Sequence, residues 1–341
     1  MHDPVCNRNV RTSKDFATVS KATAIILAAG KSTRMKSEMP KVLHDICGRS
    51  MLSYVIEACR GAGVGRLVIV VGHRKDDVIA AFADCDDIVW VEQKEQKGTG
   101  HAAQMCKDAL AGCDGQVLCI AGDMPLIRQD TLEQLLAENA RTGDAVTLAT
   151  SVLDDPTSYG RIIRDNANAL SAIVEDKDCT DAQRKVCEVN VSYYCFDGKR
   201  MFDLLDNLSN DNAKGEYYIT DTVADSLKNG WGAGAVAAVP PEDAMGINSR
   251  ADLAVVARMM QGRIQNRWMD QGISIVDPSS TWIESDAVIG KETTIYPFTF
   301  VGRNAQIGDA CRIGPHAMIS SGEVIASGTI VCGSSTAEAN V

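Results

Sequence analysis

The chain has 341 residues, of which 45% are hydrophobic and 23% charged, and its net charge is −11. This length allows a substantial core and two domains, and the negative charge argues against a nucleic-acid partner, which normally needs a basic face. No apolar run is long enough for a transmembrane helix and no secretory signal is present, so we expect no membrane partner and a cytoplasmic location. The twelve cysteines lack metal-binding spacing and are expected to be reduced thiols.

Residues 1–21 are polar and are predicted to be a disordered extension. From residue 22 to 250, apolar runs typical of strands alternate with helical patterns, which predicts a doubly wound, mostly parallel α/β sheet. Strands are expected at 24–29, 66–71, 88–91, 116–121 and 145–151, and helices at 51–59, 77–82, 100–110 and 130–141, the last with Asp130 as a plausible cap. Ligands of such sheets gather at the carboxyl ends of the strands, where Gly30 and Asp123 fall.

Two different patterns follow. Residues 251–272 carry Leu253, Ala257, Met260, Ile264 and Trp268 at helical spacing and are expected to form one long connecting helix. Within residues 273–341, an aliphatic residue recurs at every sixth position from Ile283 to Val331. Nine such hexads predict three coils of a parallel β-helix.

The stretch after the first strand suits a phosphate-bearing ligand. Small residues at 28–30 allow a close backbone turn, and the cationic Lys31, Arg34 and Lys41 follow. The stretch matches neither the dinucleotide fingerprint nor the P-loop. Taken alone, it would be read as an ordinary turn with solvated cations.

Two more turns are candidates for the same site. Asp123 follows a buried strand and is well placed to hold Mg²⁺ against a nucleotide phosphate, although a turn cap is an equal alternative. Gly98 and Gly100 permit close approach of a ligand around Thr99, or the turn is a helix entry capped by Thr99. His101 reads as structural, because no carboxylate or nucleophile neighbours it in the sequence.

Taken together, these motifs resemble one family. Leu-Ala-Ala-Gly-x-x-Thr-Arg-Met (27–35) with Pro-Lys-Val-Leu (40–43) resembles the signature of sugar-1-phosphate nucleotidyltransferases. Further matches are Gly-Thr-Gly-His-Ala (98–102), Gly-Asp-x-Pro-Leu-Ile (122–127), Tyr-Gly-Arg-Ile (159–162), Gly-Glu-Tyr-Tyr-Ile-Thr-Asp (215–221) and Gly-Ile-Asn-Ser-Arg (246–250). They are similar to bacterial N-acetylglucosamine-1-phosphate uridylyltransferases, whose Rossmann-like domain continues into a left-handed β-helix that carries an acetyltransferase.

The resemblance implies attack of a sugar 1-phosphate on the α-phosphorus of UTP, with Mg²⁺ as cofactor and a homotrimer through the β-helix. Its implied catalytic residues are Arg34 and Lys41, and its implied metal ligands are Asp123 and Asn248. The implied nucleotide site is Leu27, Ala28, Ala29, Gly30, Gln93, Gly98 and Thr99. The implied N-acetylglucosamine site is Gly160, Glu175, Asn190, Tyr218 and Thr220.

The chain departs from the family pattern at Ser32, at Ala121 and at Val191-Ser192 after Asn190. The last two leave the sugar open, so glucose 1-phosphate or a thymidylyl donor remains an alternative. The acetyltransferase of the family needs more coils and basic residues than the hexads here supply, and His316 is the one histidine among them. We therefore expect no acetyltransferase activity. A non-catalytic regulatory subunit on the same fold is the alternative from another class.

Overall fold

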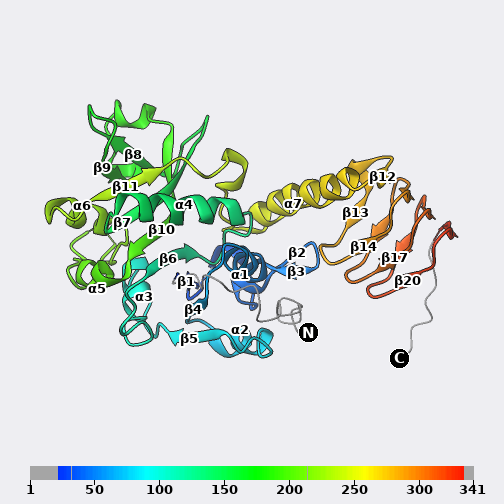
Figure 1. The fold of residues 1–341 in the computed structure, drawn as a ribbon, viewed down its shortest axis with the longest axis horizontal. Coiled ribbons are helices and arrows are strands. Elements are labelled where there is room, and N and C mark those ends of the chain that lie inside the picture. Colours follow the sequence, from blue (N-terminus) through cyan, green and yellow to red (C-terminus); the bar gives the residue numbers. More distant parts are fainter. Residues whose placement is uncertain (1–21, 32, 213, 334–341) are drawn as a thin grey trace. The chain divides into compact units, whose positions relative to one another are not determined.

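The computed structural model describes residues 22–31, 33–212 and 214–333, so the predicted extension at 1–21, Ser32 and the last eight residues lie outside the described residues. The described chain divides into two compact units. One comprises residues 22–44 and 51–248, and the other comprises residues 45–50 and 249–333 (Figure 1).

The first unit is built on a nine-stranded sheet with the strand order β11-β7-β10-β6-β1-β4-β5, from which β8 and β9 branch off β10. β1 pairs in parallel with β4 and β6, whereas β10 runs antiparallel between β6 and β7. The strand bounds are β1 Thr23–Leu27, β4 Arg66–Val71, β5 Ile88–Glu92, β6 Gln116–Ala121, β7 Val146–Val152, β8 Gly160–Arg164, β9 Leu170–Val174, β10 Glu188–Asp197 and β11 Ala233–Val236.

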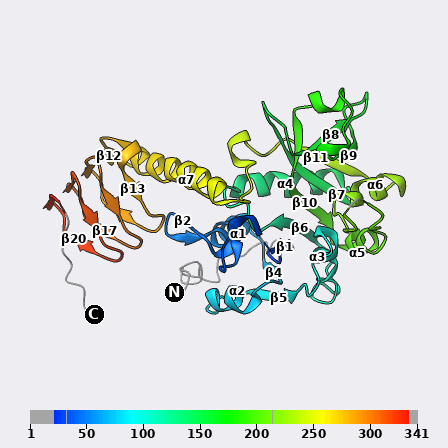
Figure 2. The ribbon, with the colours of Figure 1, turned by 180° about the vertical axis from the view of Figure 1, so that it is seen from behind.

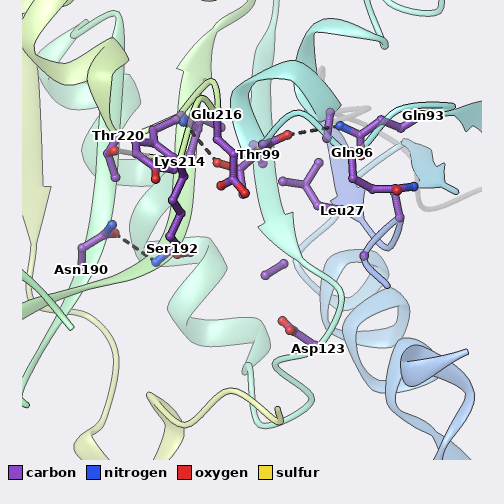
Figure 3. Close-up of a pocket in the computed structure, with 18 of the residues that line it drawn as sticks. Leu27, Gln93, Gln96, Thr99, Asp123, Asn190, Ser192, Lys214, Glu216 and Thr220 are labelled. Atoms are coloured by element: carbon purple, nitrogen blue, oxygen red, sulfur yellow. Dashed lines mark hydrogen bonds between the residues drawn. The ribbon is translucent and has the colours of Figure 1, made fainter. Parts of the chain in front are cut away.

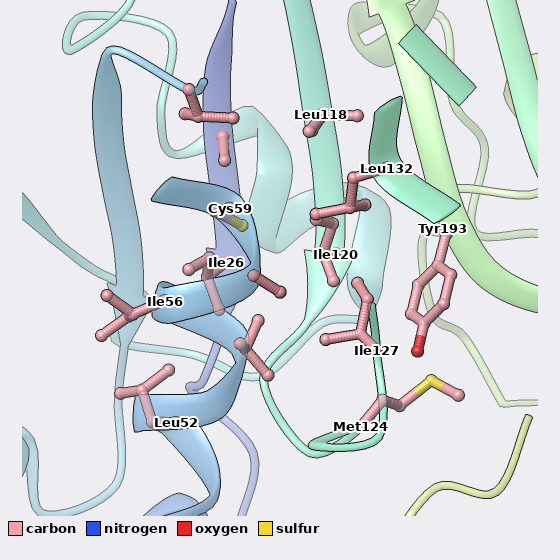
Figure 4. Close-up of a cluster of buried hydrophobic side chains, with 14 of the residues drawn as sticks. Ile26, Leu52, Ile56, Cys59, Leu118, Ile120, Met124, Ile127, Leu132 and Tyr193 are labelled. Atoms are coloured by element: carbon pink, nitrogen blue, oxygen red, sulfur yellow. The ribbon is translucent and has the colours of Figure 1, made fainter. Parts of the chain in front are cut away.

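Helices cover both faces of this sheet, as Figures 1 and 2 show from opposite sides. Along β1, Ala24 and Ile26 pack into the cluster with α1, α2 and α4, whereas Ile25 packs into the cluster with α3, α5 and α6. Figure 4 shows Leu52 and Ile56 of α1 in the first cluster. The helix bounds are α1 Met51–Gly61, α2 Lys75–Ala81, α3 Thr99–Gln104, α4 Gln129–Thr142, α5 Gly198–Asp206 and α6 Asp221–Lys228. The doubly wound α/β prediction is confirmed, but the sheet is mixed and not mostly parallel, because four of its strand pairs are parallel and four are antiparallel.

Two local predictions are wrong. The helix expected at 100–110 ends at Gln104, because the next backbone bonds are tighter turns, such as Lys107 N–H to the Gln104 carbonyl at 3.1 Å. Asp130 is not the cap of α4, since the cap position is Arg128 and Asp130 lies in the first turn. A carboxylate there still suits the positive end of the helix dipole.

Among the described residues, the cysteines follow the expectation with one exception. Ten cysteines of the described residues are free thiols. Cys85 is disulfide-bonded, so the expectation that every cysteine is reduced is wrong at this position. The spacing of the cysteines along the sequence did not indicate this disulfide, because spacing carries no information about which thiols meet in space.

The second unit contains the predicted left-handed parallel β-helix. Ten two-residue strands form three parallel sheets. From β13 onward, paired strands lie eighteen residues apart, as Ile283 and Val301 do, whereas β12 pairs with β15 twenty residues later. The aliphatic residues of the hexads point inward and are buried from Ile283 to Ile319. The strands are β12 Ser274–Ile275, β13 Trp282–Ile283, β14 Val288–Ile289, β15 Thr294–Ile295, β16 Phe300–Val301, β17 Gln306–Ile307, β18 Arg312–Ile313, β19 Met318–Ile319, β20 Val324–Ile325 and β21 Ile330–Val331.

The same unit holds the long helix α7, Arg250–Asp270, which starts with a capping box between Ser249 and Asp252. Its buried positions include Val256 and Gln261, neither of which the predicted apolar face contained. The Gln261 side chain donates to the Ile283 carbonyl at 2.6 Å and accepts from the Ile283 N–H at 3.0 Å. A side chain of the helix therefore forms hydrogen bonds with backbone groups at the open start of the β-helix, where no preceding coil can pair with them.

A short hairpin, β2 (Asp45–Ile46) and β3 (Arg49–Ser50), also belongs to the second unit although it precedes α1 in the sequence. Arg49 forms a buried ion pair with Asp286, with its Nε 2.9 Å from a carboxylate oxygen. Ser285 N–H donates to the Cys47 carbonyl at 2.8 Å. These contacts attach the hairpin to the first coil.

Candidate active site

A cavity of about 720 Å³ opens at the carboxyl ends of β1 and β6 in the first unit. From β1, the chain proceeds to β4 and β5 on one side, and β6 lies on the other. The strand order therefore reverses at β1. Where the order of strands reverses, a crevice forms between adjacent strand ends, and open α/β sheets bind their ligands there. The turns after β1 and β6 meet there, since Gly122 N–H donates to the Leu27 carbonyl at 2.9 Å.

At one end of the site, polar groups from distant parts of the sequence converge. The Lys41 ammonium forms an ion pair with Asp123 and lies 3.2 Å from Asn248 Oδ1. Arg34 donates to the same Asn248 oxygen at 2.8 Å. Ile247 N–H donates to the Asp123 carbonyl at 3.1 Å and so brings Asn248 to this point. One carboxylate and one amide oxygen thus both face the Lys41 ammonium, and the amide oxygen also faces Arg34.

At another part of the cavity, the turn at 93–101 contacts the segment 217–219. The Gly100 N–H donates to the Tyr217 carbonyl at 2.9 Å, and the Thr99 hydroxyl accepts from Ile219 N–H at 3.2 Å. The alternative in which Thr99 caps the helix is wrong, because Gly98 is the residue at the cap position. The turn is instead held against a segment far away in the sequence.

Gly98 is required by this arrangement. Its φ is +108°, a conformation that side chains rarely adopt, and a Cβ there would lie 2.4 Å from the Tyr217 carbonyl oxygen. The close contact of the two segments therefore depends on the missing side chain.

The opposite side of the cavity carries neutral and acidic hydrogen-bonding groups. Asn190 donates to the Tyr194 hydroxyl at 2.8 Å and accepts from Ser192 N–H at 3.0 Å, so its amide orientation is fixed. Figure 3 shows Asn190 and Thr220 on one side of the cavity, with Gln93 and Gln96 on the other. Burial raises the pKa of the Glu175 carboxyl, which lies on the same side as Asn190.

A buried arginine supports the segment that carries Glu175. Arg161 on β8 is 2% exposed and donates to Asp176 at 2.9 Å. Its other amino group bonds the Tyr159 carbonyl. Because Asp176 directly follows Glu175, this ion pair restrains the position of that carboxyl group.

The structure places most of the predicted site residues around one cavity. Those that line it are Leu27, Ala28, Ala29, Gly30, Lys41, Gln93, Gly98, Thr99, Asp123, Glu175, Asn190, Tyr218 and Thr220. Gly160 is not a lining residue, but a Cβ on it would lie 3.6 Å from a Glu175 carboxylate oxygen and 3.8 Å from Asn190 Cβ. Arg34 and Asn248 join the cavity through their contacts with each other and Lys41.

A family model described as the MobA-like NTP transferase domain matches residues 24–215, which is more than half of the chain. The matched region contains β1, β6 and the turns that carry Lys41 and Asp123. The chain belongs to the MobA-like NTP transferase domain family. A second model, the bacterial transferase hexapeptide with six repeats, matches residues 286–321 within the β-helix.

Relatives of the chain include a bifunctional protein GlmU from Pelobacter propionicus, which is 44% identical over 87% of the chain. A protein of the same name from Geotalea daltonii is 40% identical over 90% of the chain. The chain covers 65% of the first relative's length and 67% of the second's. It thus spans about two thirds of these relatives.

A solved structure of a UDP-glucose pyrophosphorylase complexed with UDP-glucose is similar to the chain with a TM-score of 0.55. The similarity covers 71% of this chain and 99% of that one at 18% identity, and it shows the NTP transferase fold alone.

Several residues that line the cavity were not among the predicted ones. The sequence offered no signal for Lys214 or His73, which are single polar residues in turns. Gln96 lies inside the Gly-rich turn at 93–101 and could have been included by its position. Ser192 has a φ of +62° at a bulge in β10, which the sequence signals only as a polar residue in an apolar run.

Proposed function

We propose that the chain transfers a uridylyl group from UTP to N-acetylglucosamine 1-phosphate, forming UDP-N-acetylglucosamine and releasing pyrophosphate. The observation that carries the proposal is the convergence of Lys41, Asp123 and Asn248 at one end of a cavity whose other side carries Glu175 and Asn190. Cations beside a carboxylate suit a triphosphate with its metal, and neutral amides and acids suit sugar hydroxyls.

The chain's own residues would act by position and charge. The phosphate monoester of the sugar is already a nucleophile, so the reaction needs no serine or cysteine to attack first. Lys41 and Arg34 would neutralise the triphosphate and stabilise the charge that grows on the leaving pyrophosphate. The backbone of residues 27–30 would hold the nucleotide, as small side chains let it approach closely.

The residues present fit a bound Mg²⁺. Asp123 and Asn248 Oδ1 already face one cation, the Lys41 ammonium, so their oxygens converge on a single point. Mg²⁺ commonly takes one or two protein oxygens and completes its shell with water and substrate phosphates. When bound, the ion would neutralise phosphate charge and align the triphosphate.

The sugar is proposed from Gly160, Glu175, Asn190, Tyr218 and Thr220. Glucose 1-phosphate and a thymidylyl donor remain the second candidates, because Ala121 and Ser192 lie in the cavity where the family pattern differs. Both residues have small side chains, and Tyr194 of β10 is the large side chain that lines the cavity beside them.

A substrate panel tests the proposal. The chain, Mg²⁺, and UTP or dTTP are incubated with N-acetylglucosamine 1-phosphate, glucose 1-phosphate or galactose 1-phosphate, and pyrophosphate is measured. We expect the highest kcat/KM with UTP and N-acetylglucosamine 1-phosphate. No pyrophosphate with any hexose 1-phosphate would refute the proposal. Acetyl transfer from acetyl-CoA to glucosamine 1-phosphate, which we do not expect, is assayed in parallel.

We also propose a homotrimer formed through the β-helix and a cytoplasmic location. Flat faces of β-helices suit symmetric packing, and apolar side chains at Val288, Met318, Val324 and Ile330 are exposed on strands of this one. The ten free thiols support a reducing compartment, and the Cys85 disulfide stands against it. In the described residues, no helix has the length and apolar character to span a membrane.

A further inference from the structure

The side chain of Gln93 is held by two contacts at its amide nitrogen. Nε2 lies 3.2 Å from the Gly98 carbonyl oxygen and 3.0 Å from His101 Nδ1 (Figure 3 shows Gln93 and this turn). A carbonyl oxygen can only accept, so the nitrogen of the amide and not its oxygen must face Gly98. Both N–H groups of the amide are therefore used within the turn.

The same geometry determines the state of His101. Since Gln93 Nε2 donates to it, His101 Nδ1 must be an acceptor, which requires a neutral ring with its proton on Nε2. Gln93 is 3% exposed and lines the cavity, and among the described residues nothing donates to its Oε1. The oxygen is the one group of this amide left for a ligand.

We propose that His101 is a positioning residue that fixes the Gln93 amide, so that its oxygen selects a nucleotide base bearing an N–H group. The inference rests on the proposed function, since it assumes that a nucleotide binds in this part of the cavity. Uracil and thymine carry an N–H at ring position 3, whereas cytosine has an acceptor there. An amide oxygen held in place accepts from the first two and repels the third.

The restraint matters because a free amide discriminates poorly. If the Gln93 amide could rotate by half a turn, it would present N–H donors and pair with cytosine. Rotation would also place the amide oxygen against the Gly98 carbonyl oxygen. The hydrogen bond to Gly98 that is lost in this way is long, at 3.2 Å, so it is a weak restraint by itself. His101 adds a second acceptor, and two acceptors on the same nitrogen make the rotated state doubly unfavourable.

The surroundings of the His101 ring favour its neutral form. Burial lowers the pKa of the ring, and Lys97 lowers it further, while the Glu95 carboxylate and a backbone hydrogen bond with Glu95 oppose this. Lys97 and Glu95 form an ion pair at 2.5 Å, and the Tyr217 ring lies 6.3 Å from the imidazole. As the pH falls through the lowered pKa, Nδ1 gains a proton and two donors face each other, so the preference for UTP falls toward acid.

Calorimetry with UTP and with CTP, each with Mg²⁺, tests the proposal on the full chain at about pH 7.5 and about pH 5.5. The ratio of the two affinities is used, because the triphosphate titrates equally in both. In the wild type we expect a clear preference for UTP that shrinks at the lower pH. In His101→Phe, which keeps a ring but no acceptor, we expect the ratio to fall by about tenfold at pH 7.5.

His101→Asn places an amide oxygen near the position of Nδ1 and cannot become charged in this pH range. We expect it to keep the UTP preference and to lose the pH dependence, which a merely structural role of the ring would not produce. His316→Phe in the β-helix is the matched control and should leave the ratio unchanged. Circular dichroism checks that each variant is folded.

A UTP preference unchanged in His101→Phe, or one absent from the wild type, would overturn the proposal. Neither result depends on turnover, so the uridylyl transfer proposed above could still hold. Conversely, a chain that releases no pyrophosphate but shows the expected change in affinity ratio would support the role of His101 while refuting the reaction.

Discussion

Lys41 lies where two oxygens from distant segments converge, and its side chain is only 10% exposed. Pro40 precedes it in an extended conformation and the short helical turn Lys41–Leu43 follows, which directs the ammonium toward Asp123. An ammonium restrained in this way is preorganised for a phosphate, because it need not be ordered again when the ligand binds.

Replacing Lys41 by alanine should reduce turnover by about a thousandfold, as expected when a main source of transition-state charge stabilisation is lost. The unfolding midpoint should change little, because the partner Asp123 is 29% exposed and can be hydrated. Pyrophosphate release and thermal unfolding are the measurements. Lys107→Ala, which removes an exposed ion pair with Asp206, is the control and should keep full activity. Near-normal turnover of Lys41→Ala would mean that the reaction occurs elsewhere.

Gly98→Ala should raise KM for UTP and lower the stability of the protein by about 1–3 kcal/mol, since the new Cβ would meet the Tyr217 backbone in a strained conformation. Gly112→Ala is a matched control, because Gly112 also has a positive φ but its Cβ would meet nothing within 4 Å. If both variants have the same effect on KM, the contact between the turn and Tyr217 does not matter for binding.

At the scale of elements, α7 acts as the first layer of the β-helix. Gln261 bonds both backbone groups of Ile283, and Gln265 donates to the Thr281 carbonyl at 2.8 Å. A β-helix has unpaired strand groups at its start, and these two side chains satisfy some of them.

Gln261→Leu should therefore lower the free energy of unfolding by about 2 kcal/mol or more, because it leaves a buried N–H and a buried carbonyl without partners. Denaturant unfolding followed by circular dichroism measures this. Asn266→Ala, at an exposed position of the same helix, should change stability by less than about 0.5 kcal/mol. Equal effects of the two variants would rule out the capping role of Gln261.

The elements also show what could be predicted from the sequence. The β-helix was predictable because every coil repeats the same inward position, from Ile283 onward. Gln261 and Gln265 were not, since polar residues on a helix are read as solvent-facing until their backbone partners are known. The antiparallel direction of β10 was equally hidden, because an apolar run does not encode the direction of its neighbours.

The site was predictable in part, because some of its residues have positions that a regular pattern in the sequence defines. Gly30 and Asp123 follow apolar strands, and the ends of parallel strands meet at one edge. The placement of Asn248 beside Lys41 depends on the backbone bond from Ile247 to Asp123, which no local pattern announces. The motif resemblance grouped these residues, whereas Lys214 lay outside any motif and Ser192 stood out only as a departure from the family pattern.

At the scale of the whole molecule, the exposed apolar residues of the β-helix suit a surface that packs against other copies of the chain. Val324 is 70% exposed on β20, in the same sheet as the exposed Val288. Such side chains are typical of surfaces that become buried between copies.

Light scattering should give a mass of about three times the 36.5 kDa chain, because the exposed face would be buried in a symmetric trimer. Val324→Glu should shift the mass toward that of a single chain, since a charge would have to be buried at the interface. A monomeric wild type would contradict the proposed assembly.

The central claim is that the first unit transfers the uridylyl group of UTP, which contains the α-phosphate, to a sugar 1-phosphate. The most direct measurement follows UTP labelled at the α-phosphate, incubated with Mg²⁺ and N-acetylglucosamine 1-phosphate. We predict that the label appears in UDP-N-acetylglucosamine in a one-to-one ratio with released pyrophosphate, and that Lys41→Ala forms both about a thousandfold more slowly. Label that remains in UTP, or that appears in UMP without a sugar nucleotide, would contradict the account.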